Sequence, residues 1–281
     1  MSTSLKTQPA HPPLAGGSLL DQIELKHGPI ALLGRFFLLA EQAARDRGIH
    51  LRLHTDMASL VEAYPNVLPG RTVPVLPIFD PAHSELSPQN AFWISGHDDS
   101  GMIVATQAAR LFDMTGSTVE REFTSMRPFF TEPEKHLAAG TQCLFDCPPA
   151  NEITGRVVYS GCAIYHPKVR GCGLSGILPR ISRALAYSTW NSGHTVSLLE
   201  NILITKNVHL SYGYTQHGQS VRLRGTNRGD VDFEFVWMPT PEMLEDLTTY
   251  TSETVANEVR NTETTDTNWL PSRHQGNNSR S

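Results

Sequence analysis

Residues 157–190 constrain the fold of this chain more than any other stretch, because three different patterns follow one another there without a gap. An apolar run rich in β-forming residues, 157–165, ends at a proline. A short turn that contains Gly171 and Gly173 follows it. Apolar residues then recur with helical spacing over 174–185, and basic residues occupy the opposite side. The stretch therefore predicts a strand, a glycine-rich turn and an amphipathic helix.

The predicted turn has the chemistry of an anion-binding site. The first backbone N–H groups of a helix have no partner within the helix and can bind a phosphate or pyrophosphate. Glycine allows the backbone to approach such a group closely. Lys168 and Arg170 would add positive charge, although loop residues of this kind are also simply solvated. Glycine-rich turns also occur only to begin a helix, so the turn alone does not specify a ligand.

Composition narrows the class of protein. With 281 residues, 39% hydrophobic and 18% charged, the chain can bury a full core as a globular α/β protein. A net charge of −5 gives no support for nucleic-acid binding. The sequence shows neither a secretory signal nor an apolar run long enough for a membrane span. Four cysteines in a chain of this length do not indicate a disulfide scaffold, so we expect a cytoplasmic protein without a membrane partner.

The regions before residue 91 are predicted to be a flexible arm (1–17), then helices and a proline-rich loop (18–90). Pro29 is expected to open the first helix as its first residue. Thr55 or Asp56 is expected to cap a second helix that runs to Tyr64. Two extended runs are predicted here, at 49–54 and 73–79.

The remaining elements form the predicted core, 91–240. They are a hairpin (91–96 and 102–112), a short helix (133–139), the central stretch, a strand (195–199), a helix (205–212) and a closing hairpin (221–224 and 231–237). A helix starting at residue 240 is predicted to reach 257 within a C-terminal segment 241–260. Residues 261–281 are predicted to be a disordered tail.

This order of elements resembles the GNAT superfamily of acyl-CoA-dependent N-acyltransferases over residues 91–238. The family's signature at the strand–turn–helix junction is Arg or Gln, two residues, Gly, one residue, and Gly or Ala. Arg170 and Gly173 match it, whereas Ser175 stands in place of the final Gly or Ala. A short helix that ends in Gly213-Tyr214 is similar to a second family feature.

The resemblance implies an α/β (α+β) fold: a GNAT-like mixed central sheet with flanking helices, here with a helical N-terminal extension. It implies acetyl-CoA or another acyl-CoA as co-substrate, with its pyrophosphate on the turn and its pantetheine arm between strands 157–165 and 195–201. The residues expected to bind it are Ile164, Tyr165, Lys168, Arg170, Gly171, Cys172, Gly173, Leu174, Ser175 and Asn201.

The resemblance also implies where the chemistry occurs. A backbone N–H near residues 162–164 would meet the thioester oxygen as it becomes negative, and a bulge there would aim it. The family's tyrosine acid would fall near residues 208–209, where this chain has none, so His209 or Tyr212 is the candidate acid. Glu200 is the candidate base; alternatively it only pairs with Arg156 or Arg183. Cys143 and Cys147 are too isolated to predict a metal site.

The sequence therefore predicts an N-acyltransferase that moves an acyl group, foremost acetyl, to the amine of a small molecule or a protein. Two alternatives stay open. One is a long-chain N-acyl synthase of the acyl-homoserine-lactone type. The other is a non-catalytic acyl-CoA-binding or sensor member of the fold, which the missing tyrosine favours. A homodimer is compatible with each.

Overall fold

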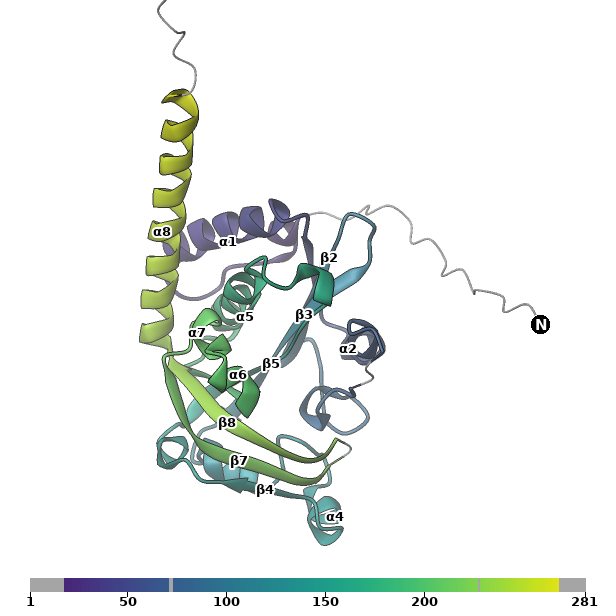
Figure 1. Ribbon diagram of the computed structural model, residues 1–281. Coiled ribbons are helices and arrows are strands. Elements are labelled where there is room, and N and C mark those ends of the chain that lie inside the picture. Colours follow the sequence, from purple (N-terminus) through teal and green to yellow (C-terminus); the bar gives the residue numbers. More distant parts are fainter. Residues whose placement is uncertain (1–17, 71–72, 227, 268–281) are drawn as a thin grey trace, which may run out of the picture.

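A computed structural model describes residues 18–70, 73–226 and 228–267, and an eight-stranded sheet forms its centre (Figure 1). Across the sheet, the strands are β1 (His50–His54), β2 (Ala91–His97), β3 (Ile103–Met114), β5 (Gly155–Tyr165), β6 (His194–Glu200), β8 (Gly229–Pro239), β7 (Gln216–Thr226) and β4 (Gln142–Phe145). Within the described residues, β5 and β6 pair in parallel and all other neighbours are antiparallel. The predicted mixed central sheet is confirmed.

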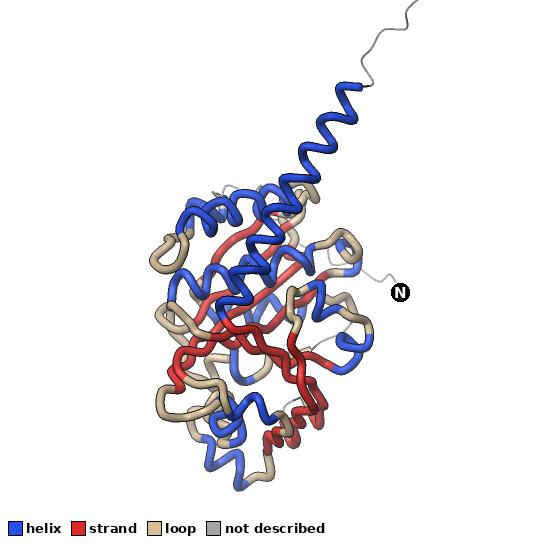
Figure 2. The backbone as a smooth tube through the Cα atoms, turned by 90° about the vertical axis from the view of Figure 1, so that its left-hand side faces the viewer, coloured by secondary structure: helices blue, strands red, loops and turns tan. Residues whose placement is uncertain are grey.

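The strands β2, β3, β5, β6 and β8 send side chains into two hydrophobic cores, one on each face of the sheet, whereas β1 contributes to the first core and β4 and β7 contribute to the second. On β5, for example, Val158 lies in the first core, whereas Val157 and Tyr159 lie in the second. The first core is covered by three helices that contact one another, α1 (Ile30–Arg45), α5 (Leu174–Trp190) and α8 (Thr240–Thr267) (Figure 2).

Shorter elements cover the second core and the end of β6. The α-helices are α2 (Met57–Ala63), α3 (Val119–Thr124), α4 (Pro133–Ala138), α6 (Asn201–Thr205) and α7 (Val208–Ser211). Single 3₁₀ turns occur at Leu19–Gln22, Tyr64–Asn66, Pro77–Phe79, Pro148–Asn151 and Pro167–Val169. α2, Tyr64 and residues 75–79 pack into the second core, beside β5. None of the described helices combines the length and the apolar composition of a membrane span.

Most predicted elements of the core are present, including the β2–β3 hairpin, the strand–turn–helix unit of β5 and α5, the helix α4, and the β7–β8 hairpin. In the N-terminal region, Asp56 caps α2 by accepting a hydrogen bond from the Ala58 N–H at 3.0 Å. β1 pairs with β2, so this region contributes an edge strand to the same sheet. The predicted flexible arm, 1–17, lies outside the described residues.

Other predictions about the elements are wrong. The run 73–79 contains a 3₁₀ turn in place of a strand, because a proline opens the turn at position 77 and has no N–H for a sheet. The helix predicted over 205–212 is divided between α6 and α7, since Asn207 takes a left-handed conformation between them. Pro29 lies just outside α1 as its N-cap. The sequence patterns also missed α3 and β4.

The last helix and the basic side of α5 differ from expectation as well. α8 continues to Thr267, past both the predicted end at 257 and the predicted start of a disordered tail at 261. Residues 268–281 lie outside the described chain. Arg180 and Arg183 of α5 are not on a solvated surface, because both turn toward Asp246 of α8. The Arg183 side chain is fully buried there.

Candidate active site

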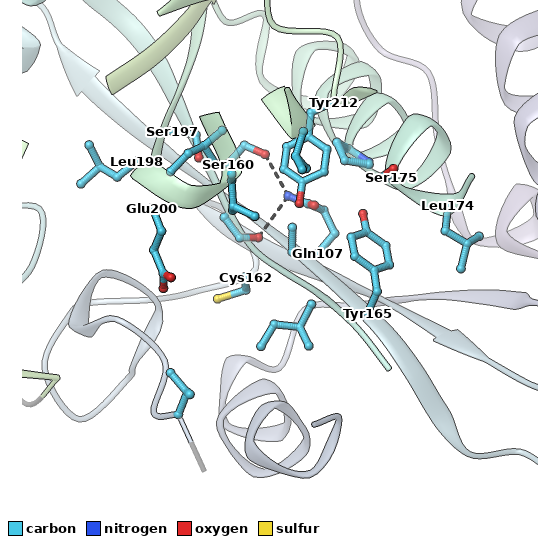
Figure 3. Close-up of a pocket in the computed structure, with 18 of the residues that line it drawn as sticks. Gln107, Ser160, Cys162, Tyr165, Leu174, Ser175, Ser197, Leu198, Glu200 and Tyr212 are labelled. Atoms are coloured by element: carbon cyan, nitrogen blue, oxygen red, sulfur yellow. Dashed lines mark hydrogen bonds between the residues drawn. The ribbon is translucent and has the colours of Figure 1, made fainter. Parts of the chain in front are cut away.

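The parallel strands β5 and β6 separate soon after they begin to pair. They share register only from Val157 to Tyr159, opposite His194 to Val196. Beyond that point, the two strands diverge and form the walls of a cavity of about 740 Å³ (Figure 3). The first turn of α5, the α6–α7 segment and parts of residues 64–79 complete its lining. The separation exposes main-chain groups of β5 that a neighbouring strand would otherwise cover.

A β-bulge in β5 lies at this separation. Thr106 pairs with Ile164 and Ala108 pairs with Gly161, so two residues of β5 stand opposite the single residue Gln107 of β3. The first of the two, Cys162, has a φ of +55°, and its carbonyl accepts a hydrogen bond from Thr106 Oγ1 at 2.8 Å. The bulge therefore reorients the main chain at the position where the sequence predicted an oxyanion-binding N–H.

The glycine-rich turn forms the mouth of the cavity. Gly171 and Gly173 have φ values of +78° and +83°, conformations that L side chains rarely adopt. A Cβ at Gly171 would meet nothing within 4 Å, so the space beside this residue is open. Arg47, just after the end of α1, supports the turn, since its Nε donates to the Cys172 carbonyl at 2.6 Å. The turn thus presents the N-terminus of α5 to an open space.

Gln107 Oε1 and the Tyr165 hydroxyl are buried polar atoms of lining residues with no hydrogen-bond partner among the described residues, and the Tyr214 hydroxyl, on a ring that Arg183 covers, is a third. The amide nitrogen of Gln107 is already committed, because it donates to Ser160 Oγ and to the Gly161 carbonyl, both at 3.0 Å. A buried polar atom without a hydrogen-bond partner is unfavourable in free energy. Binding of a ligand that offers polar groups to Gln107 Oε1 and the Tyr165 hydroxyl would therefore be favoured. An extended ligand with amide and hydroxyl groups fits this requirement.

Separating parallel strands, a bulge beside the separation and a glycine turn at the next helix occur here in the order that the sequence resemblance implied. The chain has a GNAT-like fold. No protein-family model and no curated protein matches the sequence.

Solved structures of acetyltransferases and of an N-acyl amino acid synthase are among those to which this chain is similar. A GNAT superfamily phosphinothricin acetyltransferase from Sinorhizobium meliloti has 14% identity, covers 68% of this chain and 88% of its own, and has a TM-score of 0.36. A spermidine N-acetyltransferase chimera from Vibrio cholerae and hSSAT has 11% identity, coverages of 70% and 99%, and a TM-score of 0.39. FeeM, an N-acyl amino acid synthase from uncultured soil microbes, has 8% identity, coverages of 69% and 92%, and a TM-score of 0.39. Similarity at this level supports no inference about activity.

The cavity gathers most of the residues predicted to bind a cofactor. Those that line it are Ile164, Tyr165, Arg170, Gly171, Gly173, Leu174 and Ser175. Ser175 Oγ also accepts a hydrogen bond from Ser211 Oγ of α7 at 3.1 Å, which ties the turn of the cavity to the α6–α7 segment.

Three of the predicted binding residues do not line this cavity. Lys168 pairs instead with Asp98 of the β2–β3 turn, which lies outside the cavity lining. The Cys172 thiol donates to the Val169 carbonyl within the turn itself. Asn201 is exposed at the start of α6. In this structure, Lys168 and Cys172 thus have partners outside the cavity, and Asn201 is exposed.

The two candidate acids, His209 and Tyr212, differ in their position relative to the cavity. Tyr212 lines the cavity, is 5% exposed, and burial raises the pKa of its hydroxyl to about 12. His209 lies outside the lining and packs its ring 4.9 Å from that of His217. Burial, followed by the charge of His217, lowers the pKa of His209. Only Tyr212 of this pair is placed to reach a ligand between β5 and β6.

Glu200 lies on the cavity lining at the end of β6, as Figure 3 shows. Its carboxylate pairs with Arg228 at 3.2 Å, so the predicted pairing with Arg156 or Arg183 is wrong. Arg228 comes from the β7–β8 turn, far from Glu200 in the sequence.

Sequence reasoning missed several further lining residues, among them Tyr64, Gln107, Ser160, Ser197 and Arg228. Gln107 and Ser160 are polar residues within the predicted strands 102–112 and 157–165, which was a signal for a polar site. The β7–β8 turn carries no comparable signal. The described residues also contain no group of three or more His, Cys, Asp or Glu side chains that could hold a metal ion.

Proposed function

We propose that this protein is an acyl-CoA-dependent N-acyltransferase. The observation that carries the proposal is the cavity between β5 and β6, which is lined by the glycine turn of α5, by the bulge beside Cys162 and by segments on the far side of that bulge. An anion-binding mouth joined to a narrow space between strands suits a pyrophosphate joined to a long amide-containing arm.

The chain's own groups divide the binding of such a donor among them. The N–H groups at the start of α5 bind the pyrophosphate, with Arg170 adding charge at the mouth. The exposed edge of β5 from residue 160 onward binds the amides of the arm. Gln107 Oε1 and the Tyr165 hydroxyl then gain the partners that they lack. The bound donor supplies the activated acyl group.

Three groups act on the transfer. The acceptor nitrogen forms a bond to the thioester carbonyl carbon, the C–S bond breaks, and the nitrogen loses one proton. A main-chain N–H at the bulge stabilises the negative oxygen. Tyr212 protonates the leaving sulfur, since a tyrosine hydroxyl carries its proton at neutral pH. Glu200 accepts the proton from the amine, directly or through water. Because Tyr212 is in place, the non-catalytic alternative is the less favoured one.

A specific observation favours a second candidate, transfer of a longer acyl chain. The wall beyond the bulge is apolar and is built by Leu68, Val73, Leu76 and Phe79, together with the ring of Tyr64. Apolar walls of this kind bind aliphatic chains through the hydrophobic effect. The test measures the turnover of acetyl-CoA and of octanoyl-CoA with a panel of amines, by the release of the free thiol. Faster turnover of octanoyl-CoA would favour longer-chain transfer, and faster turnover of acetyl-CoA would favour acetyl transfer.

Donor binding is tested with coenzyme A and the variant Gly171→Glu. The change forces an L residue into a left-handed turn and places a negative charge beside the proposed pyrophosphate. Saturating coenzyme A should stabilise the wild type by about 2.7 kcal/mol at 100 times Kd, seen as a rise in Tm. We expect the variant to lose most of this rise.

The matched control is Gly116→Glu. Gly116 has a φ of +79° and, like Gly171, would have nothing within 4 Å of an added Cβ, but it lies in the turn after β3, outside the cavity lining. This variant carries the same backbone strain and the same charge, so it should retain the full response to coenzyme A. An equal response in Gly171→Glu and the wild type would overturn the assignment of the turn.

A further inference from the structure

We propose that the acceptor is a small amine that also carries a carboxylate, as a free α-amino acid does, and that Arg228 binds this carboxylate. The inference rests on the N-acyltransferase function proposed above and names the substrate class of the same cavity. It follows from the position, burial and partners of one guanidinium group.

Among the described residues, Arg228 is the one deeply placed cation on the cavity lining. Arg170 and Lys206 also line the cavity, but both side chains belong to exposed residues. The Arg228 side chain is only 13% exposed, whereas its partner Glu200 is 39% exposed. Burial of a guanidinium is unfavourable unless anions and hydrogen-bond acceptors surround it. A ligand that brings an anion to this position would therefore be strongly favoured.

The partners that the protein provides for Arg228 are few. Within the part of the chain that the structure describes, its guanidinium has a single hydrogen bond, from Nη2 to Glu200 Oε1 at 3.2 Å. An arginine side chain has five N–H donors in a planar fork that matches a carboxylate. One contact to one carboxylate oxygen leaves most of that fork available to a second carboxylate.

The position of Arg228 relative to the reaction centre supports the same substrate class. Burial raises the pKa of the Cys162 thiol at the bulge, and the positive charge of Arg228 opposes this rise. Arg228 and Cys162 both line the cavity, so the guanidinium and the bulge border the same space. Glu200, its partner, is the proposed base for the amine.

The two side chains together complement a zwitterion. A carboxylate on Arg228 and an amine beside Glu200 would be neighbours, as they are on one α-carbon, because the two side chains are in direct contact. A polyamine would instead bring a second positive charge against the guanidinium, which is unfavourable beside a side chain that is largely buried. The charge arrangement thus favours amino acids over simple amines and polyamines.

The test compares each amino acid with the amine that lacks its carboxylate: phenylalanine with phenethylamine, and leucine with isoamylamine. The measured quantity is the ratio of kcat/KM for the amino acid to that for its amine. In the wild type we expect this ratio to exceed about ten. In Arg228→Gln it should fall by about 10- to 100-fold, the usual effect of losing charge-assisted hydrogen bonds. Arg228→Lys should lie between, because it keeps the charge but loses the fork.

Arg224→Gln is the matched control. Arg224 lies on β7, close to the same turn, and pairs with Asp232 at 2.6 Å outside the cavity lining. This variant should keep the wild-type ratio. The Tm of each variant, with and without coenzyme A, verifies that it is folded and binds the donor.

Calorimetry on the protein saturated with coenzyme A separates this inference from the function on which it rests. Binding of phenylalanine that depends on Arg228, without any acyl transfer, would support the carboxylate site and refute the transferase function. Acyl transfer to phenethylamine with no preference for phenylalanine would refute the carboxylate site alone. Absence of binding by either amino acid, to protein that binds coenzyme A, would also refute it.

Discussion

The two ends of the cavity are built in different ways. The donor end comes from one continuous stretch, in which β5 leads through the turn at Gly171 and Gly173 into α5. The acceptor end is assembled from distant segments that contribute Tyr64, Glu200 and Arg228. A continuous stretch fixes its geometry through local backbone preferences, whereas distant segments meet only when the whole sheet has formed.

The supports behind the two ends also differ. Behind the donor turn, Arg180 of α5 donates twice to the Asp246 carboxylate of α8, at 2.8 and 2.7 Å, and the buried Arg183 lies 3.6 Å from the same carboxylate. At the acceptor end, packing dominates: the rings of Phe79 and Tyr159 lie 5.5 Å apart against the bulged strand. Buried charges thus anchor the donor end, and close-packed rings shape the acceptor end.

The largest predicted effect is on kcat and concerns Tyr212, the proposed acid. Tyr212→Phe removes the proposed acid with no loss of carbon volume, so kcat should fall by roughly 10²- to 10⁴-fold. The affinity for coenzyme A should change little. Tyr165→Phe is the comparator, because it removes another cavity hydroxyl, one assigned to binding, and should weaken donor affinity more than it lowers kcat. Steady-state kinetics and calorimetry measure both quantities; equal kcat losses in the two variants would contradict the assignment.

A second prediction tests the anchor of the donor end. Asp246→Ala leaves the Arg180 and Arg183 charges buried without a counter-ion, which should lower the free energy of unfolding by about 3–5 kcal/mol. Urea denaturation measures it. Glu132→Ala is the control: it breaks an exposed pair with Lys135 and should cost less than about 1 kcal/mol. A similar small cost in both variants would show that α8 does not anchor α5.

The weakest predicted change compares the same substitution at the two ends. A Cβ at Gly161 would lie 2.8 Å from Phe79 Cε2, so Gly161→Ala should destabilise the protein by about 1–3 kcal/mol. A Cβ at Gly176, in the first turn of α5, would lie 3.6 Å from its nearest neighbour. Gly176→Ala should therefore stabilise the protein, by up to about 1 kcal/mol. Urea denaturation measures the change in the free energy of unfolding. Changes of opposite sign in the two variants would support a close-packed acceptor wall, and equal changes would refute it.

Several site residues were beyond prediction from the sequence for identifiable reasons. His209 and Tyr212 are three residues apart, but α7 is short and irregular, so helical spacing did not reveal which of them faces the cavity. Lys168 has the right charge and position in the turn, yet Asp98 on a different hairpin binds it. The helix pattern of α5 predicted an apolar face correctly, but it could not reveal that Arg183 is buried, because the partner Asp246 lies on α8.

Local sequence is enough to specify the donor end: the strand before the turn, the glycines that permit its left-handed conformation, and the helix whose N–H groups it exposes. These features depend on periodicity and on backbone preferences that act over a few residues. The acceptor end, in contrast, exists only in the folded sheet. The length over which β5 and β6 pair, the bulge opposite Gln107, and the meeting of Glu200 with Arg228 depend on strand register across the whole sheet, which no local pattern specifies.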